Sequence, residues 1–431
     1  MEWLNKLIQA FRIKELRNKI LFILGILVIF RLMANIPIPG ISVVNLKAFL
    51  VKFQVFGLLD VFTGGALERL SIAMLGLGPY ITSVIIFQLL TMIFPQLERM
   101  YKEEGEIGRQ KFNQYCRIAT VPLAALQAFG MLSLLQREKV ITPLSPVELF
   151  TSILTITAGC IFLMWLGELI SEKGIGEGIS LLIFAGIVAR FPLNIWSAGI
   201  DIKTNPNKIP TYLFFFLIAL VIIAGVVIVN EARRNIPVSY AKRVRGTRVY
   251  GGVATYLPLS LNPAGVIPII FALAIILFPV MIGHFLSNIG GPIGTFAQSI
   301  ANFLNPQGDS FGYIICLFFL VLIFTYFYTA VTFDPKTIAD NLQKSGGFIP
   351  GIRPGRKTAE FLQFILNRLL LFGGIFLGII AILPPIVAKL TEIKTFSFLI
   401  GGTSLLIIVA VILDFWRKLN AQLEMYEYEK F

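Results

Sequence analysis

The sequence predicts an all-α integral membrane protein with ten transmembrane helices, and three observations predict this class. Hydrophobic residues make up 56% of the 431 positions, and the mean hydropathy is +0.81. Charged residues account for only 14% of the chain, whereas soluble domains average about 25%. Apolar runs of about 20 residues, the length that a helix needs to cross the hydrocarbon core, recur ten times.

The ten runs follow one another along the whole chain. They occupy residues 20–36, 70–94, 118–135, 150–170, 178–198, 212–230, 264–283, 313–332, 369–390 and 396–416. Two of them contain unusual residues. The first run holds Arg31 near its end, where a long side chain can reach the membrane interface, and Arg190 and Pro192 interrupt the fifth run.

The basic residues predict the orientation of the chain. The net charge is +13, and with the N-terminus inside, 26 of the 37 Lys and Arg residues fall in cytoplasmic segments. This distribution follows the positive-inside rule and puts both termini in the cytoplasm. The N-terminal segment itself is basic and has Leu4, Leu7, Ile8 and Phe11 at helical spacing. We therefore expect it to lie on the membrane surface.

A short internal repeat divides the chain into two halves. Residues 178–183 and 402–407 both have the pattern G-x-S-L-L-I, and they begin the fifth and tenth predicted spans. The two spans run in opposite directions in the predicted topology, so the repeat indicates inverted halves of five helices, 1–205 and 206–431. Such halves typically form a site at their interface near the bilayer midplane. A chance match between two apolar helices is the alternative.

Two cytoplasmic loops, 230–262 and 333–366, are longer than a simple connection requires. The first loop alternates Tyr240, Val249 and Tyr250 with basic residues, which predicts a projecting hairpin. The second contains Gly-Ile-Arg-Pro-Gly, a turn sequence that would hold Arg353 at a tip. Long ordered loops are usually functional. The alternative is that both loops are solvated and serve only as basic anchors.

The chemistry that enzymes and ion-coupled transporters need is missing from the span centres. Glu168, Glu231 and Asp414 lie at span ends, and His284, the one histidine, lies at the end of the seventh span. There is no HExxH, GxSxG or P-loop pattern, and the three cysteines have no metal-ligand or disulfide spacing. We expect no cofactor. A secondary transporter of a small solute and an intramembrane enzyme are the disfavoured alternatives to a passive channel.

Seven stretches resemble the SecY family, whose members form the central subunit of the bacterial protein-conducting channel. They are DVFTGGALERLSI, GPYITSVIIFQLL, WLGELISEKGIGEGISLLIFAGIV, YAKRVRGTRVYGG, NPAGVIPIIFALAIILFP, FDPKTIADNLQKSGGFIPGIRPG and GGTSLLIIVAVILDF. The resemblance implies a pore-forming subunit of the Sec translocon that moves unfolded polypeptides across the membrane and releases transmembrane segments laterally into lipid. It also implies that the two halves surround a central pore.

The resemblance implies two sets of residues along the pore. One is a ring of aliphatic side chains that closes the channel, which corresponds here to Leu77, Ile81, Ile179, Ile183, Ile270 and Ile407. The other is a plug, a short half-helix at about 58–70, with Asp60, Phe62, Thr63, Gly64, Gly65, Glu68 and Arg69. Without the resemblance, ordinary helix packing is the preferred explanation for each of these isoleucines.

The resemblance further implies a lateral gate and a docking surface. Gate candidates are Gln88, Gln127 and Phe278, with plain interhelical hydrogen bonds as the alternative role of the glutamines. Docking candidates are Lys242, Arg243, Arg245, Arg248, Arg353 and Arg356. The implied partners are the subunits SecE and SecG, the SecA ATPase motor, the ribosome, a translocating polypeptide with its signal sequence, and lipid. The implied location is the bacterial inner membrane.

Overall fold

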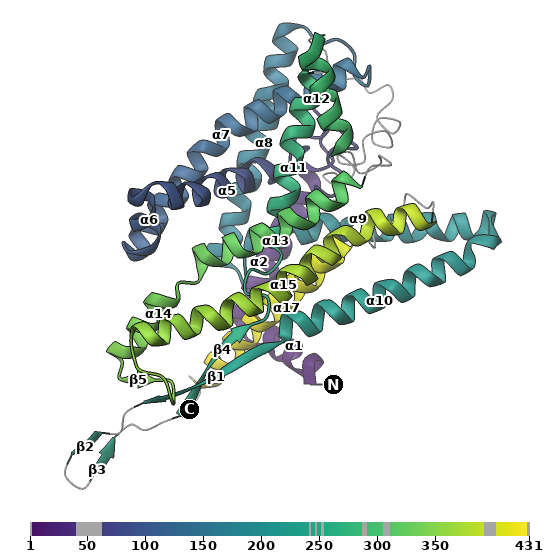
Figure 1. Ribbon diagram of the computed structural model, residues 1–431. Helices are drawn as coiled ribbons and strands as arrows, with labels where there is room; N and C mark the ends of the chain where they lie inside the picture. Colours follow the sequence, from purple (N-terminus) through teal and green to yellow (C-terminus); the bar gives the residue numbers. More distant parts are fainter. Residues whose placement is uncertain are drawn as a thin grey trace.

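The computed structural model describes residues 2–39, 63–240, 243–245, 248–250, 254–286, 291–304, 311–391 and 402–428. The chain is mostly helical, as predicted (Figure 1). A helix occupies each of the ten predicted runs: α2 (Lys14–Met33), α5 (Gly78–Ile93), α7 (Gly105–Arg137), α8 (Pro146–Lys173), α9 (Gly178–Thr204), α10 (Ile209–Glu231), α11 (Ile267–Leu286), α13 (Gly312–Thr332), α15 (Arg356–Thr391) and α17 (Gly402–Tyr428).

Several of these helices have the length and apolar composition of membrane spans. Within the described residues, six helices meet both requirements on their own, and α5 together with α6 (Pro95–Lys102) would make a seventh. The α5–α6 pair is bent by 111°. Pro95 begins α6 and cannot donate a backbone hydrogen bond to the preceding turn, which explains the break. These helices are consistent with the predicted ten-span chain.

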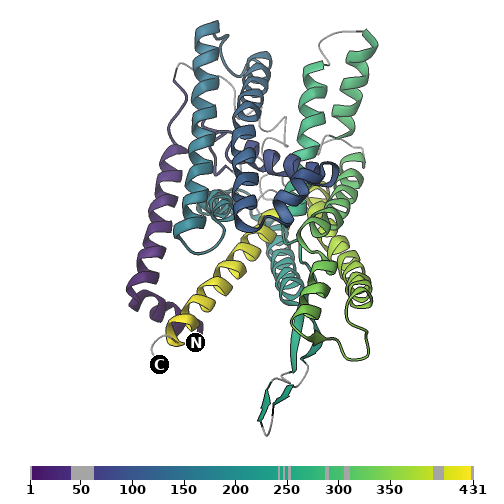
Figure 2. The same ribbon diagram turned by 90° about the vertical axis from the view of Figure 1, so that its left-hand side faces the viewer.

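Shorter helices join or flank the long ones. They are α1 (Glu2–Arg12), η1 (Pro206–Lys208), α12 (Gly291–Phe303) and α14 (Pro335–Lys344). The predicted N-terminal helix is thus present as α1, which contacts α17. Near this contact, the Tyr426 hydroxyl of α17 donates a hydrogen bond to the Glu15 carboxylate at the start of α2. Both ribbon views put the chain ends and the strands at one end of the molecule (Figures 1 and 2).

The two long loops form a three-stranded sheet and a separate two-stranded hairpin. Strand β1 (Arg233–Tyr240) pairs antiparallel with β4 (Ala254–Ser260), and β2 (Arg243–Arg245) pairs with β3 (Arg248–Tyr250). The hairpin predicted in the first loop is therefore confirmed. The sequence did not indicate that the second loop adds a strand, β5 (Gly347–Phe348), to the free edge of β1. A separate hydrophobic cluster packs beneath the sheet, with buried residues Ile236, Val238, Leu259, Ile349 and Leu362.

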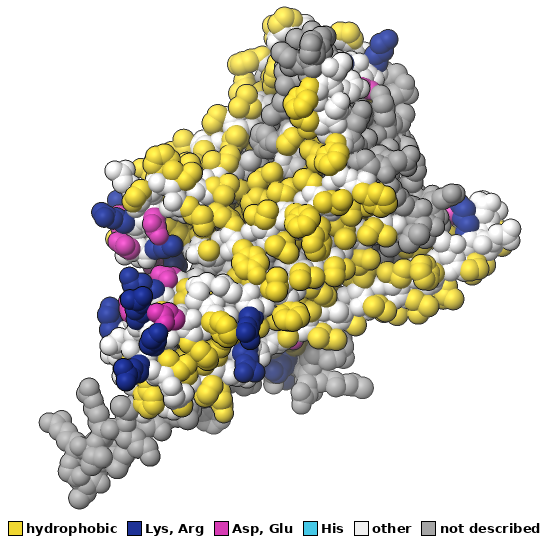
Figure 3. Space-filling view, in the orientation of Figure 1, with side chains coloured by type: hydrophobic (Ala, Val, Ile, Leu, Met, Phe, Trp, Pro, Cys, Tyr) yellow, Lys and Arg dark blue, Asp and Glu magenta, His cyan; other side chains and the backbone are white. Residues whose placement is uncertain are grey.

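The surface separates apolar and basic regions. Hydrophobic side chains cover the face formed by α7, α10, α13 and α15, while Lys and Arg gather near α6 and α14 (Figure 3). On α10, Leu213, Phe216, Leu217 and Val221 are all more than half exposed. A soluble protein rarely exposes such a continuous apolar face. The pattern is that of helices surrounded by lipid, with a polar end beside the sheet.

Candidate functional site

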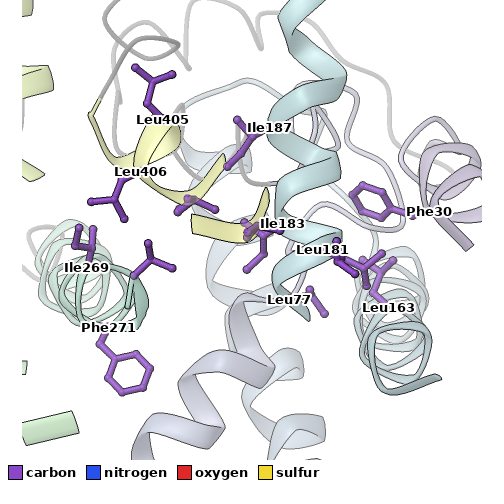
Figure 4. Packing of buried hydrophobic residues seen from close by; sticks show 14 of the residues in the cluster. Phe30, Leu77, Leu163, Leu181, Ile183, Ile187, Ile269, Phe271, Leu405 and Leu406 are labelled. Carbon is purple, nitrogen blue, oxygen red and sulfur yellow. The ribbon is translucent and has the colours of Figure 1, made fainter. Parts of the chain in front are cut away.

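The six aliphatic residues predicted as a ring lie in one large hydrophobic cluster, to which α9, α11, α17 and the start of α5 contribute them. Leu77, Ile183 and Ile407 are buried, and Ile81, Ile179 and Ile270 are partly buried against them. Leu77 precedes α5, Ile183 lies on α9, Ile270 on α11 and Ile407 on α17. In Figure 4, Leu77 and Ile183 lie close to each other, with Ile269 and Leu406 from neighbouring helices across from them. We call these six residues the aliphatic ring.

The internal repeat has a structural counterpart. Gly178 begins α9 and Gly402 begins α17, so both matching hexamers start a helix. The three apolar residues that end each hexamer, 181–183 and 405–407, are all buried. Helices α9 and α17 also contact each other. Matching segments therefore bring matching side chains, Ile183 and Ile407, into the same cluster.

A cavity of about 270 Å³ lies beside the hydrophobic cluster that contains the aliphatic ring, since Leu181, Val266 and Val411 belong to both. Its polar lining includes Glu177, Ser180, Asn262, Asp414 and Arg417. Along α9 the cavity residues precede the ring residue at 183, whereas along α17 they follow the ring residue at 407. The two helices thus pass from cavity to ring in opposite chain directions, as an inverted repeat requires.

Polar contacts join the cavity to the root of the sheet. Arg417 on α17 donates to the Asn230 carbonyl at 2.9 Å and pairs with the Glu231 carboxylate at 2.6 Å. The Asn262 side chain donates to Asn230 Oδ1 at 3.2 Å and to the Gly265 carbonyl at 3.0 Å. This junction connects the ends of β1 and β4 to α11 and α17, the helices that carry Ile270 and Ile407.

The segment predicted as the plug packs against α9 at Gly186, beyond Ile183 in the chain, and its conformation corrects two predictions. Asp60 and Phe62 fall outside the described residues. From Thr63 to Leu77 the chain runs through turns and an isolated bridge rather than a half-helix, and the second span's helix begins at 78, not at 70. Positive φ angles at Gly64, Gly65, Leu70 and Gly76 explain this, because they cannot occur within a right-handed helix.

Two arginines hold this segment, and sequence reasoning did not assign them to it. Arg31 of α2 donates from Nη1 to the Gly64 carbonyl, and Arg190 of α9 forms an ion pair with Glu68. Both arginines were visible in the sequence only as charges within apolar runs. A charge inside a span is itself a signal of a functional contact, but the sequence could not name the partner.

The rest of the segment is anchored by apolar burial. Leu67 and Leu70 are fully buried in a cluster with Met131 and Leu132 of α7. The Leu70 carbonyl also accepts the Ile38 amide at 2.9 Å. Thr63 is buried, whereas Glu68 and Arg69 are exposed. The segment is therefore part of the packed structure, with its charged side chains on one face.

The gate candidates lie on α5, α7 and α11, which are helices on the two sides of the predicted lateral gate. Helix α11 contacts both α5 and α7, so the helices on the two sides of the predicted gate meet. Gln88 on α5 is buried, and its Oε1 has no hydrogen-bond partner in the part of the chain that the structure describes. Gln127 on α7 is partly buried near Gly78. The side chain of Phe278 lies outside the described residues.

The docking candidates lie at the end of the molecule that carries the sheet. Arg353 is exposed in a turn between Gly351 and Gly355, whose φ angles are +83° and +87°. Arg356 is 92% exposed and pairs with Glu360 one helical turn away. Residues 243, 245 and 248 lie on strands β2 and β3, with side chains outside the description, and Lys242 is not described.

The described residues contain no group of three His, Cys, Asp or Glu side chains that could hold a metal ion.

A sequence model described as SecY matches residues 71–416. The chain belongs to the SecY family. A protein translocase subunit SecY of Thermus thermophilus is 45% identical over 98% of this chain and 96% of its own length.

Solved structures share the SecY-family fold of this chain at low sequence identity. One is a SecY structure whose plug domain is described as stabilising the closed state of the translocation channel and maintaining a membrane seal. It is 22% identical, with a TM-score of 0.67, over 93% of this chain and 91% of that one. Another is Sec61 in a canine ribosome–channel complex from the endoplasmic reticulum, with 21% identity, a TM-score of 0.65 and the same coverage.

Proposed function

We propose that this SecY-family chain is the pore-forming subunit of a protein translocase. It conducts unfolded polypeptides across the membrane passively and releases transmembrane segments sideways into lipid. The observation that carries this proposal is the order of features along α9. Glu177 and Ser180 line the polar cavity, Ile179 and then Ile183 belong to the aliphatic ring, and Gly186 and Arg190 contact the segment 63–70. This is the order expected of a vestibule, a constriction and a plug.

The chemistry of each layer suits this role. A narrow ring of aliphatic side chains opposes the entry of water and ions because it cannot replace their hydration, and it deforms around a passing chain. The polar cavity provides hydrated groups at the mouth of the pore. The plug, residues 58–70, adds a second barrier, and its glycine pair permits a hinge. Nothing in this path calls for a covalent step by the chain itself.

A lateral exit between α5 and α7 on one side and α11 and α13 on the other would let apolar segments leave the pore. The contacts of α11 with α5 and α7 support a closed exit. Gln88, Gln127 and Phe278 are the proposed gate residues. The buried Gln88 amide oxygen has no hydrogen-bond partner among the described residues, and such an unsatisfied acceptor destabilises the packing around it.

The sheet of both loops forms the proposed docking surface for SecA or the ribosome, with Arg353 at an exposed turn. The Sec61 relative in a ribosome–channel complex supports a ribosomal partner for this surface. SecE and SecG would cover lipid-facing helices. The basic residues near α6 and α14 support a cytoplasmic sheet end, and hence cytoplasmic termini, in a bacterial inner membrane.

The proposal is tested with the purified channel complex in lipid vesicles. We expect SecA and ATP to drive a secretory protein into the vesicles, and small solutes not to accumulate in the absence of a translocating chain. Deleting residues 60–70 should leave an assembled channel that conducts ions at rest. Concentrative uptake of a solute without a polypeptide would instead favour a secondary transporter.

A further inference from the structure

The segment 63–70 is tied to two helices by polar contacts of different kinds. The guanidinium of Arg31 on α2 donates a hydrogen bond to the backbone carbonyl of Gly64. Arg190 on α9 pairs with the Glu68 carboxylate, and its side chain is only 20% exposed against 40% for Glu68. One contact thus holds the start of the segment and the other holds its middle.

Close backbone packing fixes the segment between these two contacts. A Cβ atom at Gly64 would lie 3.0 Å from the Cα of Gly186 on α9, and one at Gly65 would lie 3.0 Å from Nη2 of Arg190. Both glycines also have positive φ angles. The Arg190 side chain therefore passes over Gly65 on its way to Glu68, so it contacts the segment along its length rather than at one atom.

The arginine and the ring residue lie on one face of α9. Ile183, Gly186, Ile187 and Arg190 are spaced at three, four and seven residues, which places them in one stripe. At 1.5 Å per residue, Arg190 lies about 10 Å along the axis from Ile183. Any movement of α9 that widens the ring would therefore also move the partner of Glu68.

The charges around the segment favour its present position. Arg31 and Arg190 lie within electrostatic range of each other and repel, so a carboxylate beside them is stabilising, while Arg69 of the segment also repels Arg31 and acts in the opposite direction. The Glu68 carboxylate carries the opposite charge and forms an ion pair with Arg190. Moving the segment away would separate Glu68 from Arg190. Arg31 and Arg190, which both lie within apolar runs, would then lose the nearby carboxylate. Such charges are costly at membrane depth when their partner is removed.

We propose that Arg31 and Arg190 are positioning residues that clamp the plug in the closed pore, through the Gly64 carbonyl and the Glu68 carboxylate. This proposal rests on the plug function proposed above. The clamp sets how readily the resting channel opens, and the shared face of α9 links its release to widening of the aliphatic ring. Neither residue needs to contact the translocating chain for this role.

The test is the resting conductance of the complete channel complex in planar bilayers. Glu68→Arg and Arg190→Glu should each raise the resting open probability about tenfold, a size between the effects of losing an exposed and a fully buried ion pair. The double variant Glu68→Arg/Arg190→Glu should return close to the wild-type value, because it restores the pair. Arg31→Met should also raise it. Lys208→Glu breaks the Lys208–Asp201 pair at the far end of α9 and should change nothing.

The outcomes separate the clamp from the plug. If deleting 63–70 makes the channel leak while both charge reversals stay closed, the plug stands and the clamp is wrong. If the double variant leaks as much as the single variants, a specific ion pair is also excluded. A silent Arg31→Met contradicts the two-point arrangement. If the deletion itself does not leak, both the plug and the clamp are wrong. Glu68→Gln and Arg190→Gln repeat the test if a reversed charge prevents assembly, which co-purification of the partner subunits reports.

Discussion

Ile183 and Ile407 occupy the sixth position of two matching hexamers, and both side chains are buried in the same aliphatic cluster. Each hexamer begins its helix at the glycine, and the polar cavity lies before Ile183 along α9 but after Ile407 along α17. Equivalent residues of the two halves thus reach one point from opposite chain directions. This relationship is the geometric basis for the pore that we propose.

The first prediction concerns the apolar character of the ring. Ile407→Asn puts an amide where a buried aliphatic side chain stands, which should disfavour the dry closed state by about 1–3 kcal/mol and ease wetting. We expect secretion of proteins with defective signal sequences to increase in cells that carry this variant. Ile412→Asn, at an exposed site on the same helix, is the control. Unchanged export at normal protein levels would count against a pore position for Ile407.

The second prediction concerns Arg353. Its exposed turn suits it to bind a carboxylate or a phosphate with a planar, two-pronged guanidinium, which lysine matches poorly. Arg353→Glu should leave insertion intact and strongly reduce ATP-dependent translocation into vesicles, while Arg353→Lys should recover only part of the rate. Arg109→Glu, an exposed charge reversal on α7, is the matched control. Equal translocation by wild type and Arg353→Glu would show that the docking contact lies elsewhere.

The third prediction concerns the contact between the two loops. A Cβ atom at Gly347 would approach the Tyr240 ring to 3.0 Å, so Gly347→Val should displace β5 from β1. The cost should be about 1 kcal/mol or more, since two paired residues are lost. Limited proteolysis should then cut the chain near 346–355 faster, with membrane insertion unchanged. Phe348→Val, at the exposed neighbouring position of the same strand, should increase cleavage less; an equal increase would contradict the pairing.

The fourth prediction concerns the buried Gln88. Its Oε1 lacks a hydrogen-bond partner among the described residues, so Gln88→Leu removes an unsatisfied acceptor and should stabilise the closed gate by about 1–3 kcal/mol. Thermal unfolding of the purified complex should shift upward, and weakly hydrophobic signal sequences should be used less efficiently. A lower unfolding temperature would mean that the Gln88 amide contributes a bond to the closed arrangement.

Hydropathy predicted the helices well because the membrane imposes both their length and their composition. It placed the start of the second span at 70 because residues 70–77 are apolar, and composition does not encode the positive φ angles at Leu70 and Gly76. The resemblance to the SecY family supplied the ring and the plug. No periodicity brings residues of four separate helices to one point.

The contacts that sequence reasoning missed are those between distant segments. Arg31 and Arg190 were recognised as charges in apolar runs, but their partners at Gly64 and Glu68 lie 33 and 122 residues away in the chain. Strand β5 has only two residues, too few to give a pattern, and its partner β1 lies about a hundred residues earlier. Both features depend on how the helices pack, which a single sequence does not specify.

The central claim is that a polypeptide crosses the membrane through the aliphatic ring, and site-specific crosslinking tests it most directly. A photoreactive amino acid at position 407 or 183 would be irradiated while a secretory protein is arrested during SecA-driven translocation, with position 221 on the exposed face of α10 as the control. We predict crosslinks to the arrested chain from 183 and 407, dependent on ATP, and none from 221. Absence of crosslinks from both ring positions, while translocation proceeds, would contradict the pore.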